Sequence, residues 1–534
     1  MLLVLPCAAA PAATGSYDSL VALYKDIRTA GQPPLVDGVA DFRAATIRER
    51  EAKIPEFRRR LAAIDASNWD TPKKVDYLLV QTALNALEFQ FRVERPWFID
   101  PGFYIDQVER VAYADLPASG ADLDKLKARL NGVPKILDQA KQNLGHASRE
   151  YTKLAIHDLT TADGVGHGMP FRDVPPAGTR GWFADFLERA KSQQPDLVPA
   201  AQKALAAVDN FDAWLKQHQS QMTAPAGVGE ADFNWYLKYV RCMPYTMKDS
   251  VLIGQLEYNR AMAFLALQRH HDRKLPEIAL PTSKEEYDAR MKDAEDSIRQ
   301  FIIDNDLMTM PAYTMGHLAQ NVPWIVRTGG HRNFWEEMQY RDPRPDTVHA
   351  TLPGHSYDGI VHRHDQRPIR GTFSDSGRTE GWAFYLEESM LQLGFLDQRP
   401  RSKELFYIFQ AARGLRDPAE AKLQKNEWTI DQAVKYMVEG VPYMDDDVAR
   451  VDCAIYLRRP TYGLSYQLGK AEMLRLLGDR EHQLGEKFDL KQFYDDFMAA
   501  GIIPISLIRW EMTGHDDEVR DLWKVAPIPS IPHD

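Results

Sequence analysis

Helical periodicity extends along almost the whole 534-residue chain and restricts the folds that it can adopt. Apolar residues recur at spacings of three and four, as in amphipathic helices, whereas the alternation typical of strands is confined to short pieces. Clusters of Pro and Gly interrupt this pattern without forming a linker. In the first 306 residues the pattern predicts helices over 38–66, 71–93, 122–148, 180–220, 231–273 and 283–306.

The C-terminal third continues in the same way, so we expect a mainly α fold. The predicted helices there span 379–394, 400–425, 429–440, 447–457, 461–478, 489–499 and 503–512. Pro460 suits the first turn of a helix, and Gly501 suits the end of one. Residues 308–378 are expected to hold loops and minor β pieces. We find no internal repeat, so residues 16–534 are predicted to form one large helical domain, which could be arranged as two lobes around a cleft.

The balance of charge and apolar residues argues against several classes of partner. The formal net charge is −11, whereas a nucleic-acid-binding face would need a basic surface. No stretch approaches the roughly 18 apolar residues that a membrane-spanning helix requires. We therefore expect neither nucleic-acid binding nor a transmembrane span, and a homodimer stays open.

The first 15 residues have the composition of a secretory signal, with Ala10-Pro11-Ala12 as a small-x-small cleavage site. Cys7 lies in a segment loosely similar to a bacterial lipoprotein box. This pattern predicts export to the periplasm or the outside of a bacterium, with or without a lipid anchor. A disordered alanine-rich tail is the alternative. Cys242 and Cys453 are too few for a disulfide framework and are expected to be isolated buried thiols.

The segment from His349 to Glu387 carries the residues with the clearest chemistry. His349, His355 and Glu380 are the ligand types that a divalent metal, most often zinc, takes from a catalytic site. Six residues on one helix place two side chains about 240° apart, but Pro353-Gly354 can break the helix and return His355 towards His349. Glu387 follows Glu380 by seven residues and is expected to orient a ligand histidine.

A structural role for these residues is the alternative interpretation. The two histidines could be polar loop residues, and Glu380 could be an acid that stabilises the first turn of a helix. His362 and His364 would be alternative metal ligands, although both are more typical of a solvated loop.

Several motifs, in order, resemble one bacterial family. His349-x-x-x-Pro-Gly-His355 followed by Glu380-Gly-Trp-Ala-x-Tyr-x-Glu387 resembles the family called DUF885. Further similar segments are Ala412–Asp417, Glu427–Ala433, Pro460–Gly469, Phe488–Asp495 and Gly501–Pro504. The members of this family resemble helical zinc peptidases of the gluzincin type, especially the M32-like carboxypeptidases. The resemblance implies a helical fold around a cleft, a zinc ion, and hydrolysis of an amide or peptide in a small or carboxylate-bearing substrate.

The chain departs from the family pattern where proton transfer is expected. The family has a glutamate, the usual general base, after its first histidine, and this chain has Ala350. The other departures are Ala421, Asp452, Tyr462 and Tyr494. Ala350 could be an engineered change that traps a substrate. The chain could also be a divergent hydrolase, or a lyase or isomerase with a tyrosine base, or an inactive metal-binding or ligand-binding protein.

The same comparison suggests the remaining site residues. Tyrosines can accept or donate protons beside a metal, so Tyr462, Tyr466 and Tyr494 are catalytic candidates. Arg413 joins them because an arginine can stabilise an oxyanion. Lys470 and Asp417 are the candidates for contact with the substrate.

Overall fold

The periodic segments fold into helices whose first turns are capped by polar side chains. The computed structural model describes residues 15–36, 38–162, 169–170, 172, 174–318, 322–325 and 331–531. The side chain of Asp70 accepts the backbone N–H of Lys73 at the start of one helix, and Ser283 accepts that of Glu286 at another. Such caps satisfy donors that a helix start leaves unpaired. Except for Gly15, the predicted signal segment 1–15 lies outside the described residues.

The structure is mainly α, as predicted. In the first part of the chain the helices are α1 (Tyr17–Gly31), α2 (Ala44–Glu51), α3 (Ile54–Ala62), α4 (Thr71–Phe89), α5 (Pro96–Ile99), α6 (Pro101–Val108), α7 (Gly120–Asn143), α8 (Arg149–Thr160), α9 (Gly178–Gln193) and α10 (Val198–His218). The next helices are α11 (Glu230–Tyr239), α12 (Met247–Asp272), α13 (Lys284–Asp304), α14 (Phe334–Arg341), α15 (Arg344–Ala350) and α16 (His355–His362). The last are α17 (Ser376–Gln392), α18 (Pro400–Gln424), α19 (Ile430–Gly440), α20 (Asp446–Arg458), α21 (Ser465–Leu484), α22 (Leu490–Ala500) and α23 (Ile505–Thr513).

Several predicted helix boundaries are wrong, and proline accounts for most of them. The helix expected over 38–66 is divided into α2 and α3, with Pro55 in the first turn of α3. Those expected over 180–220 and 231–273 are interrupted near Pro195 and Pro244. Proline lacks an N–H and clashes with the preceding turn, so it starts a helix more readily than it continues one.

Two further expectations need correction. Residues 308–378 were expected to contain β pieces, but their described part contains α14, α15 and α16. The strands described are β1 (Leu35–Val36) and β2 (Val39–Ala40), which pair antiparallel near the N-terminus. Pro460 does not start a helix, because α21 begins at Ser465 and residues 460–464 form a turn. Gly501 ends α22 with a φ of 99°, as its predicted capping role requires.

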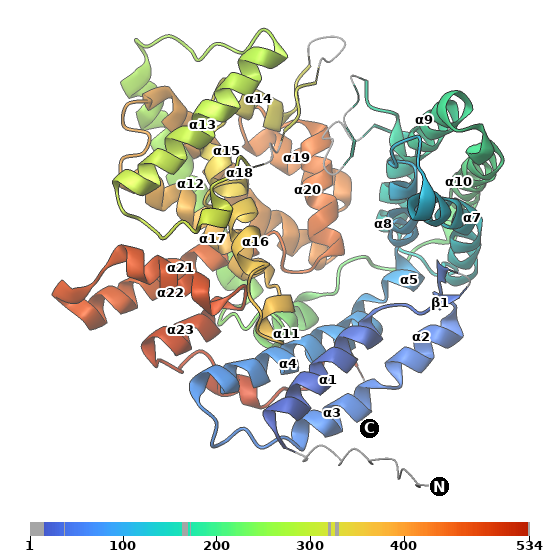
Figure 1. The fold of residues 1–534 in the computed structure, drawn as a ribbon, viewed down its shortest axis with the longest axis horizontal. Helices are drawn as coiled ribbons and strands as arrows, with labels where there is room; N and C mark the ends of the chain where they lie inside the picture. The colour runs from blue at the N-terminus through green and yellow to red at the C-terminus, as the bar shows by residue number, and fades with distance from the viewer. Residues whose placement is uncertain are drawn as a thin grey trace, which may run out of the picture.

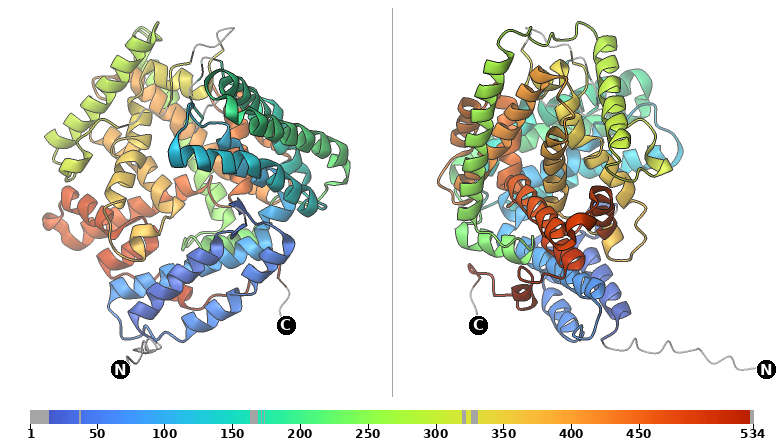
Figure 2. Two further views of the ribbon diagram at one scale, coloured as in Figure 1. Left: turned by 45° about the vertical axis from the view of Figure 1, so that its right-hand side comes forward. Right: turned by 90° about the vertical axis from the view of Figure 1, so that its left-hand side faces the viewer.

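Figures 1 and 2 show how the helices are arranged. The N-terminal helices α1, α3 and α4 lie together along one edge of the molecule, and α7, α8, α9 and α10 form a group beside them. The remaining helices form a larger group, in which α12 packs along α18 and α17 packs along α21. Cys242 and Cys453 are free and buried, as expected. No helix in the described part of the chain is long and apolar enough to span a bilayer.

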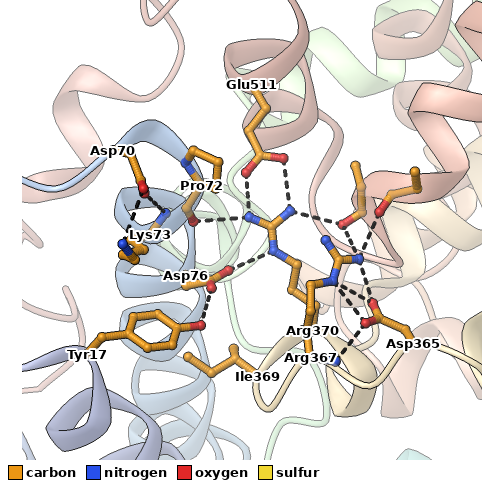
Figure 3. Close-up of polar contacts among 12 residues, drawn as sticks. Tyr17, Asp70, Pro72, Lys73, Asp76, Asp365, Arg367, Ile369, Arg370 and Glu511 are labelled. Atoms are coloured by element: carbon orange, nitrogen blue, oxygen red, sulfur yellow. Dashed lines mark hydrogen bonds and ion pairs between the residues drawn. The ribbon is translucent and has the colours of Figure 1, made fainter.

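A buried arginine connects the N-terminal edge to the chain that leads into α17. The Arg370 guanidinium donates to Asp76 on α4 at 2.7 Å and to the Pro72 carbonyl at 3.1 Å, and it pairs with Glu511 on α23 (Figure 3). Tyr17 donates to the second oxygen of Asp76 at 2.6 Å. A buried arginine needs such partners, because an unpaired buried charge is costly. This network holds together three elements that are far apart in sequence.

Helices α17 and α21 approach one another closely at glycines. A Cβ atom added to Gly469 on α21 would overlap the Gly377 carbonyl oxygen and would lie 2.6 Å from the Cα of Gly381. Only glycine lets the two backbones lie this close. The contact matters for the site below, because Glu380 adjoins Gly381 and Tyr466 lies one turn before Gly469.

We expect Gly469→Ala to lower the free energy of unfolding by about 1–3 kcal/mol, the usual cost of overpacking. The matched control is Gly478→Ala on the same helix, where an added Cβ meets no atom within 4 Å. That change should be neutral or slightly stabilising, because alanine favours helix. Chemical denaturation of both variants measures the difference. Equal stability of the two variants would contradict the close approach of the helices.

Candidate metal centre

A sharp reversal of the chain brings His349 and His355 together. Helix α15 ends at Ala350 and α16 begins at His355, with Pro353 and Gly354 in the turn between them. A Cβ atom at Gly354 would overlap the carbonyl oxygen of His349, so the turn requires glycine. The two imidazole Nε2 atoms lie 3.1 Å apart. The predicted convergence of the two histidines is therefore present in the structure.

Glu380 completes a group of three side chains. Its Oε2 atom lies 3.1 Å from Nε2 of His355 and 3.4 Å from Nε2 of His349. Glu380 was expected to begin its helix, but α17 begins at Ser376 with Asp375 as its cap. Glu380 therefore projects from the second turn of the helix. We call His349, His355 and Glu380 the triad.

The triad has the dimensions of a metal site. Zinc bonds of about 2.0–2.1 Å place the ligand atoms of a tetrahedron about 3.3 Å apart. The three distances in the triad are 3.1, 3.1 and 3.4 Å. His349 and Glu380 are buried, whereas the His355 side chain is 30% exposed. The residues present thus fit a divalent ion with three protein ligands, and one side of the triad is open.

A buried carboxylate supports the triad from behind. The Oε1 atom of Glu387 lies 2.7 Å from Nδ1 of His349 and 2.9 Å from the Arg413 guanidinium. Gln410 donates to the other oxygen at 3.2 Å. A carboxylate on the second ring nitrogen fixes the tautomer and the orientation of a ligand histidine. Glu387 therefore lies where it was expected, whereas Nδ1 of His355 has no partner in the described part of the chain.

The triad is also an electrostatic unit. Burial by itself would raise the pKa of Glu380, but the charge of His355 and hydrogen bonds from both histidines hold it well below its usual value. Burial would likewise lower the pKa of His355, but the carboxylate of Glu380 outweighs this and raises it. Without a cation, the pair therefore favours imidazolium and carboxylate. A bound divalent cation would replace that proton.

Two of the predicted tyrosines reach the triad. Tyr462 donates its hydroxyl to Oε1 of Glu380 at 2.7 Å. The ring of Tyr466 stacks on that of His349, with centroids 5.8 Å apart. Burial and the negative charge of Glu380 raise the pKa of both hydroxyls, so each keeps its proton in this arrangement. Both side chains are therefore placed as hydrogen-bond donors.

Two charged residues that lie near these tyrosines were not predicted from the sequence. Arg416 lies 4.4 Å from the ring centroid of Tyr466 and pairs with Asp452 at 2.9 Å. Glu420 accepts the backbone N–H groups of Thr461 and Leu464, so it holds the turn that carries Tyr462. Burial raises the pKa of Glu420 to about 8. Both residues belong to α18, which is otherwise largely buried. Their charge within such a helix was the only feature of the sequence that could have indicated a role for Arg416 and Glu420.

The structure places the other candidates elsewhere. Tyr494 bonds to Tyr385 at 3.0 Å, on a different face of α17 from Glu380. Lys470 is buried between Glu257 and Glu388, at 2.6 and 2.7 Å. These contacts do not support a direct role for Tyr494 or Lys470 at the triad.

Four further candidates are also separate from the triad. Asp417 is fully buried between α12 and α18, where it accepts the hydroxyl of Ser250. His364 stacks on Tyr313, and His362, two residues earlier, does not join the triad. Arg413 pairs with Glu387, and its guanidinium lies 6.0 Å from the ring centroid of Tyr466. Arg413 is therefore placed to support His349 and not to touch a substrate there.

A cavity of about 990 Å³ reaches Pro460 in the turn that carries Tyr462, and residues of α5, α6, α8, α9, α11 and α20 line it. Arg458 and Arg459 line it. Arg458 pairs with Asp100 and Asp158, whereas the guanidinium of Arg459 lies 5.9 Å from the Tyr462 ring centroid and pairs with no carboxylate of the described residues. The lining includes Pro460 of that turn but none of the three triad residues.

The sequence matches the model of one protein family over residues 28–302 and 310–512. That family is described as DUF885, a bacterial protein of unknown function. The chain belongs to the DUF885 family. Among curated proteins, none matches the chain.

Two solved structures share the fold. One is from Shewanella oneidensis and is described as a candidate lipoprotein of unknown function, with 16% identity and a TM-score of 0.68 over 93% of this chain and 100% of that one. The other is a candidate lipoprotein from Colwellia psychrerythraea, with 17% identity and a TM-score of 0.69 over 92% of this chain and 98% of that one. At these identities the likeness establishes the fold alone.

The position of Glu387 in this DUF885 chain predicts that it tunes metal affinity. We expect Glu387→Gln to weaken zinc binding about 10- to 100-fold, because the amide cannot hold the Nδ1 proton of His349 as a carboxylate does. Competition with a chromophoric chelator measures the affinity. Glu388→Gln is the control, because Glu388 pairs with Arg260 and Lys470 instead. An unchanged affinity in Glu387→Gln would contradict this role.

Proposed function

We propose that the chain is an enzyme dependent on a divalent metal, preferably zinc, that hydrolyses an amide or peptide bond in a small substrate bearing a carboxylate. One observation carries the proposal: three buried or half-buried ligand atoms lie 3.1–3.4 Å apart, with Glu387 oriented behind one of them. His349, His355 and Glu380 would hold the ion. The resemblance of the family to zinc peptidases supports hydrolysis as the reaction.

Each side chain around the triad has a task in this proposal. A bound zinc ion would supply a Lewis acid that polarises the scissile carbonyl. Tyr462 would turn its hydroxyl towards the oxygen on which negative charge develops, since preorganised donors stabilise such charge. Glu387 and Arg413 would keep His349 in one tautomer. Arg459 lies beside Tyr462 and pairs with no carboxylate of the described residues, so it would neutralise the carboxylate of a substrate that occupies the cavity.

We also propose that the protein acts outside the cytoplasm. The two solved structures are described as candidate lipoproteins, and the signal-like segment with Cys7 has the residues for export with or without a lipid anchor. Either form would place the site in the periplasm or at the cell surface.

Elimination or isomerisation is a second candidate, favoured by Ala350. Alanine cannot accept a proton where the family has its glutamate, and the hydroxyl of Tyr462 donates to Glu380 of the triad. A tyrosinate formed beside a bound cation could act as a base, because a nearby cation lowers a tyrosine pKa. An inactive binding protein that retains the metal is the third candidate.

Metal content is the first test of the proposal. We expect the purified protein to contain close to one zinc or other divalent ion per chain, and the double variant His349→Ala/His355→Ala to contain none. Elemental analysis measures both. The control is His362→Ala/His364→Ala, which should keep the metal, because neither side chain belongs to the triad. A native protein that stays metal-free after reconstitution would refute the proposal.

Whether oxygen from the solvent enters the product distinguishes the candidate reactions. A hydrolase transfers oxygen-18 from labelled water to its product, whereas a lyase releases an unsaturated product without it. We expect the metal-loaded protein to incorporate oxygen-18 into its product, detected by mass spectrometry during a screen of small peptides and N-acyl amino acids.

The variant Ala350→Glu provides a second test. Activity that rises by orders of magnitude would mark the alanine as an engineered trap, and activity that is unchanged or lower would indicate a relocated base.

A further inference from the structure

Helix α12 exposes an apolar face that none of the described residues covers. Its inner face packs on α18 through Met247, Gly254, Ala261 and Leu265, which are all buried. The opposite face presents a row of uncharged side chains: Leu252, Leu256, Asn259, Ala263, Ala266 and Leu267. Leu252, Leu256 and Leu267 are 60, 58 and 67% exposed.

Such a face is unusual on a surface helix. A helix on the outside of a globular protein normally turns charged residues to the solvent, and one that is apolar all round is normally covered on both sides. α12 is 26 residues long, or about 39 Å. Phe264 widens the face at one side, where it is 43% exposed and contacts the ring of Tyr407. The outer face is thus large enough to take part in an interface.

The spacing of the row is that of a helix-to-helix seam. Leu252, Leu256, Asn259, Ala263 and Ala266 follow one another at intervals of four, three, four and three residues, the repeat by which two helices pack side by side. Leu252 and Ala266 lie seven residues on either side of Asn259, and the row has its large side chains in the first half and its small ones in the second. An asparagine at one seam position commonly sets the register of two helices.

We propose that the outer face of α12 binds the same face of a second copy, with the two helices antiparallel about a two-fold axis near Asn259. In this arrangement the leucines of each first half face the alanines of the partner helix, so large side chains fill the space left by small ones. A parallel arrangement would set leucine against leucine and leave gaps between the alanines. A self-complementary patch of this kind is what a two-fold dimer requires.

The charges at the two ends favour the same arrangement. The first turn carries Asp249, which is exposed and whose pKa is lowered by hydrogen bonds from Thr246. The last turns carry Arg269 and His270, and Arg273 follows. With the axis at Asn259, Asp249 of one copy lies opposite Arg269 of the other. A parallel pair would instead bring the two basic ends together.

Sedimentation of the full chain tests the dimer. We expect twice the mass of one chain, and a shift to one chain in Leu256→Glu, because the new carboxylate would be buried against an apolar partner. Leu474→Glu is the control, since Leu474 is 47% exposed on α21 and does not belong to the apolar row of α12. Circular dichroism should match in all three proteins, because both leucines are exposed in one chain and neither is needed for its fold.

Cysteine pairs test the orientation. With the helices antiparallel, Leu252 of one copy lies about 21 Å along the axis from Leu252 of the other but opposite Ala266. A mixture of Leu252→Cys and Ala266→Cys proteins should therefore form disulfide-linked dimers under mild oxidation. Leu252→Cys alone should not. A crosslink in Leu252→Cys alone would overturn the antiparallel arrangement.

Two other outcomes would overturn the dimer itself. One is a native protein that sediments as a single chain at every concentration. If that protein also bound vesicles of phosphatidylethanolamine and phosphatidylglycerol, and Leu256→Glu abolished this binding, lipid and not a second copy would cover the face. The other is a dimer that persists in Leu256→Glu. Neither outcome depends on metal binding or on enzymatic activity.

Discussion

The buried carboxylate of Glu387 is the interaction on which the arrangement of the site depends. It contacts His349 from α15 and Arg413 from α18, while it projects from α17. A carboxylate with no exposed surface must be paired, because an unpaired buried charge is costly. Three helices are therefore constrained to meet at one point. The orientation of His349, and with it the shape of the triad, follows from that meeting.

Close backbone contacts supply the second constraint. Gly354 lies against the His349 carbonyl, and Gly381 lies against Gly469. A side chain at these positions would separate the elements that carry the triad and Tyr466. The site is thus held by a few charged contacts and by glycines that permit short distances between helices. Residues that bear no functional group are as necessary to the geometry as the ligands are.

Much of the site could be predicted from local sequence. His349, His355 and Glu380 were indicated by ligand type, and the turn at Pro353-Gly354 explained how two histidines six residues apart could meet. Glu387 was indicated because a spacing of seven returns to the same helix face. These predictions rest on backbone geometry over one or two helices, which local sequence determines. Tyr462 was indicated only by the family resemblance, and its bond to Glu380 joins residues that are 82 positions apart.

The sequence by itself determined the helical character of this protein, its family, and the residue types of the triad. Helical periodicity and the residues on each side of a turn act over a few residues, so they can be read along the chain. Only the tertiary structure decided that Lys470 and Tyr494 lie away from the triad, that Arg416 and Glu420 support its tyrosines, and that none of the described residues covers one face of α12. These outcomes depend on which distant helices meet, and that choice is made by the packing of the whole chain.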